Sequence, residues 1–572
     1  MARFWLWRSA WLAACLATAV SCGGHDRVDS STGAARAGGL TGSASPGDAG
    51  GSARDSGGPT SVGPADSSDD TTVPAEMDAA AVEVDAEAVD AAEADAGAGE
   101  ADATEGDADI LADGADDTGD GNGDAAEGLD ASAGIGTPDV CTFQVDGTLS
   151  SAIPTVGVVE WSTDIAGLTA AKIEFTLNDP MPNELNRGGG GSIDVTGTTH
   201  RALLLGLKGA RTYTYRIVAT AGSTDCTSAD QTLTTGAATG APLVTRVAND
   251  PDAQAPGFIV TSGGYPEQGI SPEMAYIIDA DGDIVWWTAS SARCSRALMD
   301  WEGAAMWMVD SNPVPIGTGD VRRVGMDGID VLDIVDGGLS YAHHDIAVLP
   351  GGIVAALVWA DADAGSSDLV ERAPDGTLTT VVRLDGKIFP VTRSGEAFHA
   401  NSIQYHPTDD TYTIGDEYAA AYVKLTRQGQ PLWQFGQDCT GAPAPQCATG
   451  EQGGNHGHHL LDDGRFLFFN AGIGSSSYEY QLTESMTSLT ASQLWTYMDQ
   501  TLSSIVLGDI QALPNGNRLI DYATDGVMIE LSPSGDLVQT LTALEPPTSP
   551  PNRSGSFGYA NFRESLYGPP LR

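Results

Sequence analysis

A short turn motif that recurs about every fifty residues is the feature of this sequence that most restricts its fold. The motif contains a polar residue followed by glycine, and it occurs in DADGDIVWW, GMDGIDVL, APDGTLTTV, TRQGQPLWQF and SPSGDLVQTL. The glycines are at positions 282, 328, 376, 429 and 535, so the intervals are 46, 48, 53 and 106 residues, and the last equals two repeats of 53. We expect each turn to lie between the strand that ends one repeat and the next strand.

A second marker, a glycine-containing turn before an apolar strand, appears in VLPGGIVAAL, LLDDGRFLFF and ALPNGNRLI. Repeats of about 40 to 50 residues built from four short strands are typical of a β-propeller. Counting from residue 250 to 545 predicts six blades, so we expect an all-β, six-bladed β-propeller domain over residues 243–572. The tail SGSFGYANFRESLYGPP is a candidate for the strand that closes the ring.

The region before the repeats, residues 139–238, predicts a small β-sandwich. It contains short alternating or β-branched runs such as VGVVEWSTD and TYTYRIVAT, separated by turn residues. The run Leu207 to Tyr215 resembles the tyrosine corner of fibronectin type III domains, which are immunoglobulin-like sandwiches, with Tyr213 as the corner residue. We expect Tyr213 and Trp161 to pack in the core and to have no role in function.

The first 22 residues have the layout of a secretory signal: two arginines, an apolar stretch, then small residues before Cys22. The stretch is too short for a stable transmembrane span. The ending Ala19-Val20-Ser21-Cys22 resembles a bacterial lipoprotein processing box, which implies lipidation at Cys22. The alternative is cleavage nearby by an ordinary signal peptidase. The first reading predicts an exported lipoprotein of the bacterial cell envelope, in the periplasm or on the outer-membrane surface.

Residues 23–138 predict a disordered acidic linker. They carry 27 acidic residues against three arginines and contain no Phe, Trp or Tyr, so they cannot bury enough apolar area to offset the entropy of ordering. The whole chain has 78 acidic and 27 basic residues and a formal net charge of -51. Such a balance argues against a nucleic-acid partner, which needs a basic surface.

Five cysteines follow the signal and fit an oxidising compartment. Cys141 and Cys226 lie near the two ends of the sandwich region, and Cys439 and Cys447 close the short loop CTGAPAPQC. Two disulfides, Cys141–Cys226 and Cys439–Cys447, are the natural prediction, with Cys294 left outside both pairs. A metal site at the second pair is weaker, because no C-x-x-C spacing is present.

The histidines of the repeat region suggest a functional site. Seven of the nine lie in three segments, YAHHDIAVLPGG, FHANSIQYHPTDD and GNHGHHLLDDGRFLFF. His344 and His456 each precede the leucine of the second marker by five residues, so they occupy equivalent positions in different repeats. Side chains at equivalent positions of successive blades can converge on one end of the central channel, and His399 is a third candidate for that end.

Each histidine also has an ordinary structural explanation. Neighbouring side chains point to opposite faces of a strand, so we expect at most one of His343 and His344, and at most one of His458 and His459, to face the channel. The repeat position favours His344 over His343, and His456 over its neighbours. His406 lies beside a proline turn and is expected to be a loop residue.

The repeat region resembles the bacterial aryl-sulfate sulfotransferase family. The matching segments are HHDIAVLPGG, the element His399-Ala400-Asn401-Ser402-Ile403 with its Trp433 to Gly436 ending, HGHHLLDDGRFLFFNAG and GDIQALPNGNRLI. The resemblance implies a two-step transfer of a sulfuryl group from an aryl sulfate to a phenol through a sulfohistidine, without metal or other cofactor. By motif position it implies His456 as nucleophile, His344 and His399 as donors or acid/base partners, and Asn401 as a ligand of a sulfuryl oxygen.

One position departs from the family pattern. The family places a Ser-Arg pair at the end of the strand after the His399 motif, and here Glu417 takes the place of the arginine. A carboxylate would repel a sulfate ester. Another base could substitute, with Lys424, Arg322, Arg323 and Arg393 as the candidates. A second possibility is that the donor and acceptor differ from those of the family. Otherwise the chain is a non-catalytic propeller that binds a ligand or protein at the cell surface. A third alternative is a metal-dependent hydrolase in which Asp345 and the histidines at 344, 399, 456 and 458 hold a divalent ion.

Overall fold

The computed structural model describes residues 141–570, except for 198, 264–272, 291–292, 311–319, 335–338, 361–365, 391–397 and 545–554. The predicted signal, Cys22 and the acidic linker therefore lie outside the described residues. The described part of the chain is all-β, with one short 3₁₀ helix, η1 (Ala523–Asp525). None of its helices is long and apolar enough to cross a membrane.

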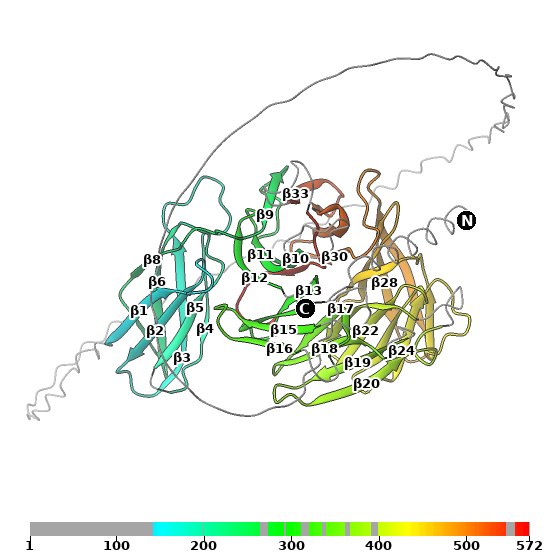
Figure 1. Cartoon of the computed structure of the whole chain (residues 1–572), viewed down its shortest axis with the longest axis horizontal. Helices are drawn as coiled ribbons and strands as arrows, with labels where there is room; N and C mark the ends of the chain where they lie inside the picture. Colours follow the sequence, from blue (N-terminus) through cyan, green and yellow to red (C-terminus); the bar gives the residue numbers. More distant parts are fainter. Residues whose placement is uncertain are drawn as a thin grey trace, which may run out of the picture. The chain divides into compact units, whose positions relative to one another are not determined.

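The first body of the structure consists of two antiparallel sheets that share one core (Figure 1). One sheet has the order β1-β2-β5, and the other has the order β4-β3-β6-β7 with β8 also paired to β6. The strands are β1 (Phe143–Leu149), β2 (Gly157–Thr163), β3 (Leu168–Leu177), β4 (Gly188–Ile193), β5 (His200–Leu204), β6 (Thr212–Ala221), β7 (Thr224–Thr227) and β8 (Gln231–Thr234).

Trp161 and Tyr213 lie in the core of this body, as predicted. Both are at most 2% exposed, and the Lys208 backbone N–H donates a hydrogen bond to the Tyr213 hydroxyl. The predicted disulfide Cys141–Cys226 is present and ties the start of β1 to β7. A disulfide between positions 85 residues apart restricts the unfolded chain, so it stabilises this body.

Six antiparallel sheets follow one another along residues 243–563. In chain order their strands are β10 (Phe258–Gly263), β11 (Met274–Asp279) and β12 (Ile284–Ala289); β13 (Cys294–Met299), β14 (Ala305–Asp310), β15 (Asp320–Gly325) and β16 (Val331–Ile334); β17 (Ala342–Leu349), β18 (Ile353–Trp359), β19 (Ser367–Arg372) and β20 (Leu378–Leu384); β21 (Ala400–His406), β22 (Thr411–Asp416), β23 (Ala421–Thr426), β24 (Pro431–Gly436) and the parallel β25 (Gln446–Thr449); β26 (Asn455–Leu460), β27 (Arg465–Asn470), β28 (Ser476–Glu484) and β29 (Leu489–Tyr497); and β30 (Asp509–Ala512), β31 (Arg518–Tyr522), β32 (Val527–Leu531) and β33 (Leu537–Leu544).

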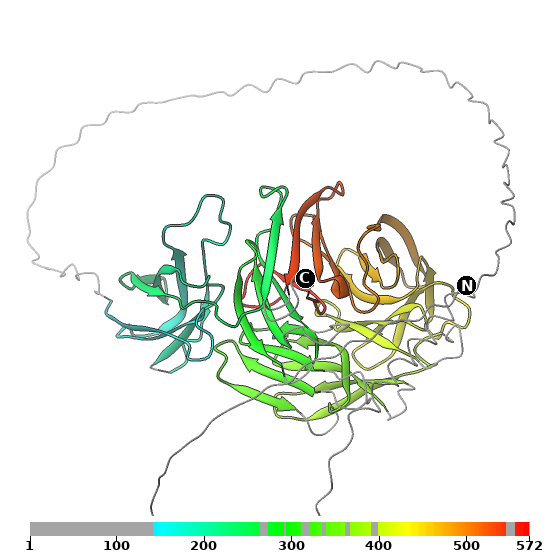
Figure 2. The same ribbon diagram turned by 45° about the horizontal axis from the view of Figure 1, so that its top comes forward.

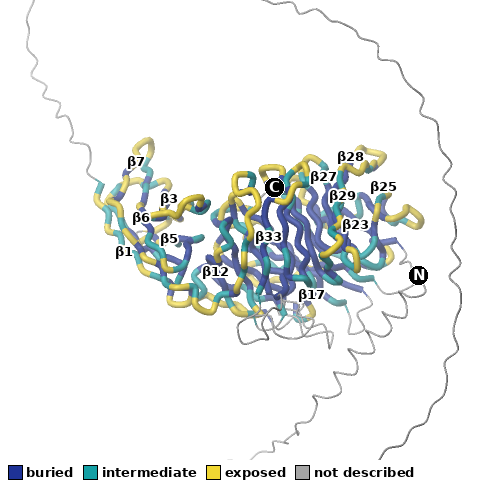
Figure 3. The backbone as a smooth tube through the Cα atoms, turned by 90° about the horizontal axis from the view of Figure 1, so that it is seen from above, coloured by how far each residue is buried: buried dark blue, intermediate teal, exposed yellow. Residues whose placement is uncertain are grey.

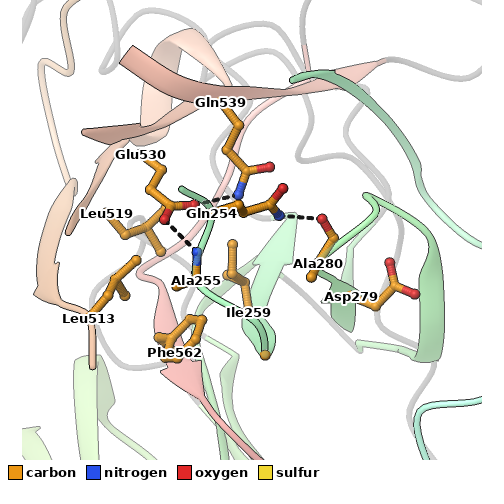
Figure 4. A pocket seen from close by; sticks show the side chains of 11 residues that line it. Gln254, Ala255, Ile259, Asp279, Ala280, Leu513, Leu519, Glu530, Gln539 and Phe562 are labelled. Carbon is orange, nitrogen blue, oxygen red and sulfur yellow. Dashed lines mark hydrogen bonds between the residues drawn. The ribbon is translucent and has the colours of Figure 1, made fainter. Parts of the chain in front are cut away.

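The strands at the two ends of this region complete its first and last sheets. β9 (Leu243–Ala248) pairs with β33 as the fifth strand of the last sheet, and β34 (Asn561–Arg563) pairs with β10 in the first sheet. The tail therefore supplies a strand, as its sequence suggested. Figure 4 shows a second link between the two sheets, in which Glu530 on β32 accepts a hydrogen bond from the Ala255 backbone, just before β10.

The recurring glycine turns lie inside the sheets rather than between repeats. They join β11 to β12, β15 to β16, β19 to β20, β23 to β24 and β32 to β33. With β34 counted as a strand of the first sheet, each turn joins the third and fourth strands of its sheet. The expectation that the turns lie between repeats was therefore wrong. All five glycines have φ between 74° and 91°, a range that side chains disfavour, so the turn itself requires glycine.

The strands that begin the six sheets lie against one another in chain order. Contacts join β10 to β13, β13 to β17, β17 to β21, β21 to β26 and β26 to β30. Figure 2 shows these sheets in sequence, from green through yellow to red. Figure 3 shows that their inner strands are buried and that the exposed residues lie mainly in the turns. Residues at the starts of these strands can therefore meet, although they are far apart in the sequence.

The sandwich is held to the first two of these sheets by both apolar and charged contacts. Ile153, Val156 and Leu205 belong to the same buried cluster as residues of β10 to β12. The Lys208 ammonium, 3% exposed, lies 2.6 Å from Asp279 Oδ2, 3.0 Å from Asp281 Oδ2 and 2.6 Å from Asp283 Oδ2. One buried cation thus links the sandwich to the turn between β11 and β12.

Candidate active site

Irregular strand starts shape the candidate site. β13, β17, β21 and β26 each shift register near their first residues: after Cys294, Ala342, Ala400 and Asn455 respectively. The motif histidines lie at or beside three of these irregularities. A bulge adds an unpaired residue and turns the neighbouring side chains, so it can aim several of them at one point.

His344 and His399 meet in the structure. Their Nε2 atoms are 3.2 Å apart and their ring centroids 4.8 Å, although 55 positions separate them in the sequence. His344 has φ of 56°, which a β-branched or bulky residue rarely adopts and which here belongs to the bulge in β17. Trp359 and Tyr418 stand beside His399, with ring centroids 5.6 and 5.0 Å away. These four side chains are partly exposed, so solvent reaches them.

His343 also contacts this cluster, although the repeat position favoured His344 over it. Its Nδ1 is 2.7 Å from His344 Nδ1, and its Nε2 is 2.9 Å from Ser367 Oγ. Its ring stacks on Trp359 at 3.8 Å. The positive φ of His344 interrupts the regular pleat, so the two neighbouring rings can contact each other.

His456 lies at the start of β26 and is 3% exposed. Its Nδ1 is 2.9 Å from the Gly454 carbonyl oxygen. A carbonyl can only accept a hydrogen bond, so Nδ1 carries the proton in this contact. The neutral ring then has its lone pair on Nε2. The backbone contact therefore favours the tautomer with the proton on Nδ1 and the lone pair on Nε2.

Asn401 holds the strand that carries His456. Its side-chain Nδ2 donates a hydrogen bond of 2.7 Å to the backbone carbonyl of Asn455, the residue before His456. The backbone carbonyl of Asn401 accepts a hydrogen bond of 2.8 Å from the Tyr559 hydroxyl. The side chain is fully buried, and its Oδ1 has no hydrogen-bond partner within the described residues. Asn401 is thus part of the site's framework, with one N–H already committed to the backbone.

Burial favours the neutral form of the histidines of the site. It lowers the pKa of His344 well below the usual value, and the neighbouring rings of His399, His343 and His456 add to the effect. Burial also lowers the pKa of His399 and of His456, whereas the negative charge of Glu417 raises both. These shared influences place His456 and Glu417 in the same electrostatic environment as the His344–His399 pair.

Asp345, the residue after His344, belongs to a buried network of ion pairs. Arg296 Nε donates to Asp345 Oδ1 at 2.7 Å and its NH1 group to Asp509 Oδ2 at 3.1 Å. The guanidinium also lies 5.1 Å from the ring centroid of Tyr559, in the C-terminal tail. Asp345 accepts the backbone N–H of Ile403 as well, so it links the first strands of two neighbouring sheets. This arginine is neutralised by its carboxylates and serves as a structural centre.

The basic residues considered as replacements for the family arginine are held by carboxylates. Lys424 pairs with Asp409, which precedes β22, whereas Glu417 follows the other end of that strand. Arg322 pairs with Asp333, and Arg323 pairs with Asp330. Arg393 lies outside the described residues. Glu417 itself is joined to the site through its backbone N–H, which donates to the His399 carbonyl at 3.1 Å.

The remaining histidines of the motifs bridge neighbouring strands. His458 Nδ1 contacts Ser402 Oγ, His459 Nδ1 accepts from the Ala512 backbone, and His406 Nε2 contacts Thr413 Oγ1. All three are at most 8% exposed, so His406 is a buried strand residue rather than the expected loop residue. The predicted Cys439–Cys447 disulfide is present in the segment that leads to β26.

Metal binding receives no support from the arrangement of side chains. Among the described residues, no group of three or more His, Cys, Asp or Glu side chains is placed to hold a metal ion. The two imidazoles of His344 and His399 face each other directly instead.

Sequence reasoning missed the aromatic and hydroxyl residues around the histidines. Ser367 begins β19, Trp359 ends β18 and Tyr418 lies in the turn after β22, and none of them belongs to a recognisable motif. Trp359 carried a weak signal, because an aromatic residue ends an otherwise small-residue apolar strand. The link between Asp345 and Arg296 had none, since 49 residues separate the two.

Comparison with known proteins yields one family match. The family model described as arylsulfotransferase (ASST) matches residues 243–545, which is 303 of the 572 residues. A search of curated proteins finds no significant match. Among solved structures, a putative 6-phosphogluconolactonase from Bacteroides uniformis shares 10% identity at a TM-score of 0.33, over 54% of this chain and 100% of that one. A streptogramin B lyase shares 11% identity at a TM-score of 0.33, over 56% and 98%.

Proposed function

The chain belongs to the arylsulfotransferase family, and from that premise we propose that it transfers a sulfuryl group from an aryl sulfate to a phenol through a sulfohistidine at His456. The observation that carries the proposal is the contact between His456 Nδ1 and the Gly454 carbonyl, which leaves the lone pair on Nε2. A neutral imidazole can attack sulfur and hold the group covalently, which divides one difficult displacement into two easier ones.

In the first step, His456 Nε2 forms a bond to sulfur while the bond from sulfur to the phenolic oxygen breaks, and the electron pair leaves with the phenolate. His399 and His344 supply hydrogen bonds and a proton to that leaving oxygen, because they are partly exposed beside one another. In the second step, an acceptor phenol gives its proton back to His399 or His344, and its oxygen bonds to sulfur while the bond from sulfur to His456 Nε2 breaks. Asn401 fixes the start of β26, and its second N–H is the group that would bind a sulfuryl oxygen.

Several features of the whole chain belong to the same proposal. We place the site at one end of the channel of a closed six-bladed propeller, supported by the pairing of β9 with β33 and of β34 with β10. The preceding body is proposed to be of the fibronectin type III or immunoglobulin-like type. Export with a lipid anchor at Cys22 agrees with the two disulfides, and cell fractionation with and without detergent tests it.

The experiment combines 4-nitrophenyl sulfate and a phenol acceptor with the full chain, beside His456→Ala and the control His406→Gln. We expect turnover by the unaltered chain, a loss of at least about 10³-fold in His456→Ala, and little change in the control. Incubation with the donor alone should leave an acid-labile sulfuryl group on the chain, detectable by intact mass. Turnover that survives unchanged in His456→Ala contradicts the assignment of the nucleophile.

The second candidate function is a propeller that binds a ligand or protein without catalysis. The observation that favours it is Glu417, whose negative charge acts on both His399 and His456 where the family has an arginine. Glu417→Arg distinguishes the two. Absence of turnover in the unaltered chain together with turnover in Glu417→Arg supports the non-catalytic alternative. Turnover in the unaltered chain excludes it.

A further inference from the structure

Three histidine rings and one hydroxyl form a continuous hydrogen-bonded chain beside the proposed nucleophile. Ser367 Oγ is 2.9 Å from His343 Nε2, His343 Nδ1 is 2.7 Å from His344 Nδ1, and His344 Nε2 is 3.2 Å from His399 Nε2. Both nitrogens of His343 and both nitrogens of His344 are thus engaged. The protonation of each ring is therefore coupled to that of the next.

Such a chain can hold one extra proton without leaving a buried group unsatisfied. If His399 is doubly protonated, its Nε2–H donates to His344, the His344 Nδ1–H donates to His343, and the His343 Nε2–H donates to Ser367. Movement of protons across the two N···N contacts then transfers the positive charge from His399 to His344 and on to His343. The serine hydroxyl suits the end of the chain because it can accept as well as donate.

The surroundings keep the chain rigid and give it a counter-charge. Trp359 stacks on His343 and also lies 5.6 Å from His399, so one ring holds both ends of the histidine series in place. Ser295 Oγ donates to the His344 carbonyl at 2.8 Å, which fixes the bulged backbone. Burial lowers the pKa of His343 and of His344, and Glu417 opposes this effect at His399. A bound sulfate ester would add a second negative charge.

We propose that His343, His344 and His399, ended by Ser367, act as one proton-holding unit of the transfer reaction. The unit gives a proton from His399 to the departing phenolate when the sulfuryl group moves to His456, and it takes one proton back from the acceptor phenol in the second step. Protons therefore balance over the full cycle. His343 is in this scheme a positioning residue, since it acts through His344, and the inference rests on the proposed function.

The experiment compares two donors of different leaving-group basicity in His343→Gln. Phenyl sulfate leaves as a strongly basic phenolate that needs a proton, whereas 4-nitrophenolate is stable at neutral pH without one. We expect kcat/KM for phenyl sulfate to fall about 10²-fold and that for 4-nitrophenyl sulfate to fall by less than about threefold. Ser367→Ala, a milder change at the end of the chain, should show the same selective loss to a smaller degree.

His458→Gln is the matched control, because His458 is a buried histidine of similar environment whose Nδ1 contacts Ser402 instead. It should affect the two donors equally. An equal loss for both donors in His343→Gln, with the unaltered chain active, overturns the relay and leaves the proposed function intact. An unaltered chain that is inactive with both donors contradicts the proposed function instead.

A second measurement reads the relay without any turnover. In the full chain labelled with ¹⁵N-histidine, the nitrogen chemical shifts of His399 report which ring atom carries its proton. We expect His343→Gln to change those shifts, although His343 does not touch His399 directly, and His458→Gln to leave them unchanged. Unchanged His399 shifts in His343→Gln would overturn the coupling on which the relay depends.

Discussion

Histidines in this protein are unusual in being mostly buried, and their environment decides what each can do. Burial lowers the pKa of seven of the eight histidines that the structure describes, in the site and outside it. A depressed pKa by itself therefore does not identify the reactive ring. Partners distinguish them: His458 and His406 contact strand hydroxyls, whereas His344 and His399 contact each other.

His406 allows the cost of this burial to be measured. Burial lowers its pKa to about 3. The unfolded chain binds a proton at this residue below its usual pKa of 6.5 and the folded chain does not, so its neutral state favours folding fully above pH 6.5 and less as the pH falls toward 3. His406→Gln removes this dependence. The unfolding free energy of the variant, relative to the unaltered chain, should rise by about 2 kcal/mol between pH 7.5 and pH 5.

Denaturant titrations at the two pH values check this difference. Thr413→Val is the matched control, because it removes the hydroxyl partner of His406 without removing the titrating ring. It should destabilise the protein by similar amounts at both pH values. A difference between His406→Gln and the unaltered chain that does not change with pH contradicts the assignment of a neutral, buried His406.

Much of the site could be predicted from residue positions, but its conformation could not. The repeat position identified His344, and the motif that begins with His399 identified that residue. The structure brings these two rings together. The alternation rule allowed only one of His343 and His344 to face the channel, and it did not predict the direct contact between their rings. That contact accompanies the positive φ of His344, which histidine adopts more readily than most residues but which the sequence does not fix at this position.

At the scale of elements, the C-terminal tail packs closely against strands β10 and β13 at Gly558. Gly558 donates its backbone N–H to the Ser262 carbonyl at 2.7 Å, and the next residue, Tyr559, bonds to Ser295 and reaches Asn401. A Cβ atom on Gly558 would lie 2.0 Å from Ser262 Oγ and 2.7 Å from the Ser295 carbonyl oxygen. Backbone on one side cannot move away, so the tail segment needs glycine at this point.

Gly558→Ala should therefore displace the tail and with it the pairing of β34 with β10. We expect a loss of about 1–3 kcal/mol in unfolding free energy, as for other overpacked interiors. Gly386→Ala is the control, because its nearest neighbour would be an ordinary contact of 3.7 Å. Thermal and denaturant unfolding of the two variants compare them, and an equal effect of both would show that the tail tolerates a side chain there.

The sequence predicted the pairing of strands that are neighbours in the chain, but it did not predict pairing between strands that are far apart in the chain. The periodic turns predicted repeats of four strands, and the described part of residues 243–563 forms six sheets of four or five strands. The turns were placed wrongly, between repeats, because their spacing does not reveal which pair of strands they join. The strand β9 was not foreseen, since it pairs with β33 nearly 300 positions away. Such pairing depends on the assembled sheets rather than on any local pattern.

At the scale of the whole molecule, ion pairs of one lysine connect the sandwich to the first sheet of the repeat region. The ammonium of Lys208 faces Asp279, Asp281 and Asp283 together, with Glu184 3.8 Å away. Burial tends to lower the pKa of Lys208, but Asp279 and Asp283 outweigh it and raise the pKa. Loss of this cation would leave several carboxylates close together with Asp279 fully buried.

Lys208→Met should thus destabilise the protein by about 3–5 kcal/mol, the usual cost of removing one partner from a buried ion pair. Arg216→Met is the control, since the Arg216–Glu174 pair is 49% and 32% exposed and should contribute less than about 1 kcal/mol. Unfolding by denaturant, with limited proteolysis between the sandwich and β9 as a second measure, tests the comparison. Equal stability of the two variants contradicts the role assigned to Lys208.

The composite first and last sheets have a consequence for biogenesis. β9 pairs with β33 and β10 pairs with β34, so both sheets remain incomplete until residues 537–563 have been synthesised. A polypeptide that ended before residue 537 would expose unpaired strand edges in both sheets, and such edges favour aggregation.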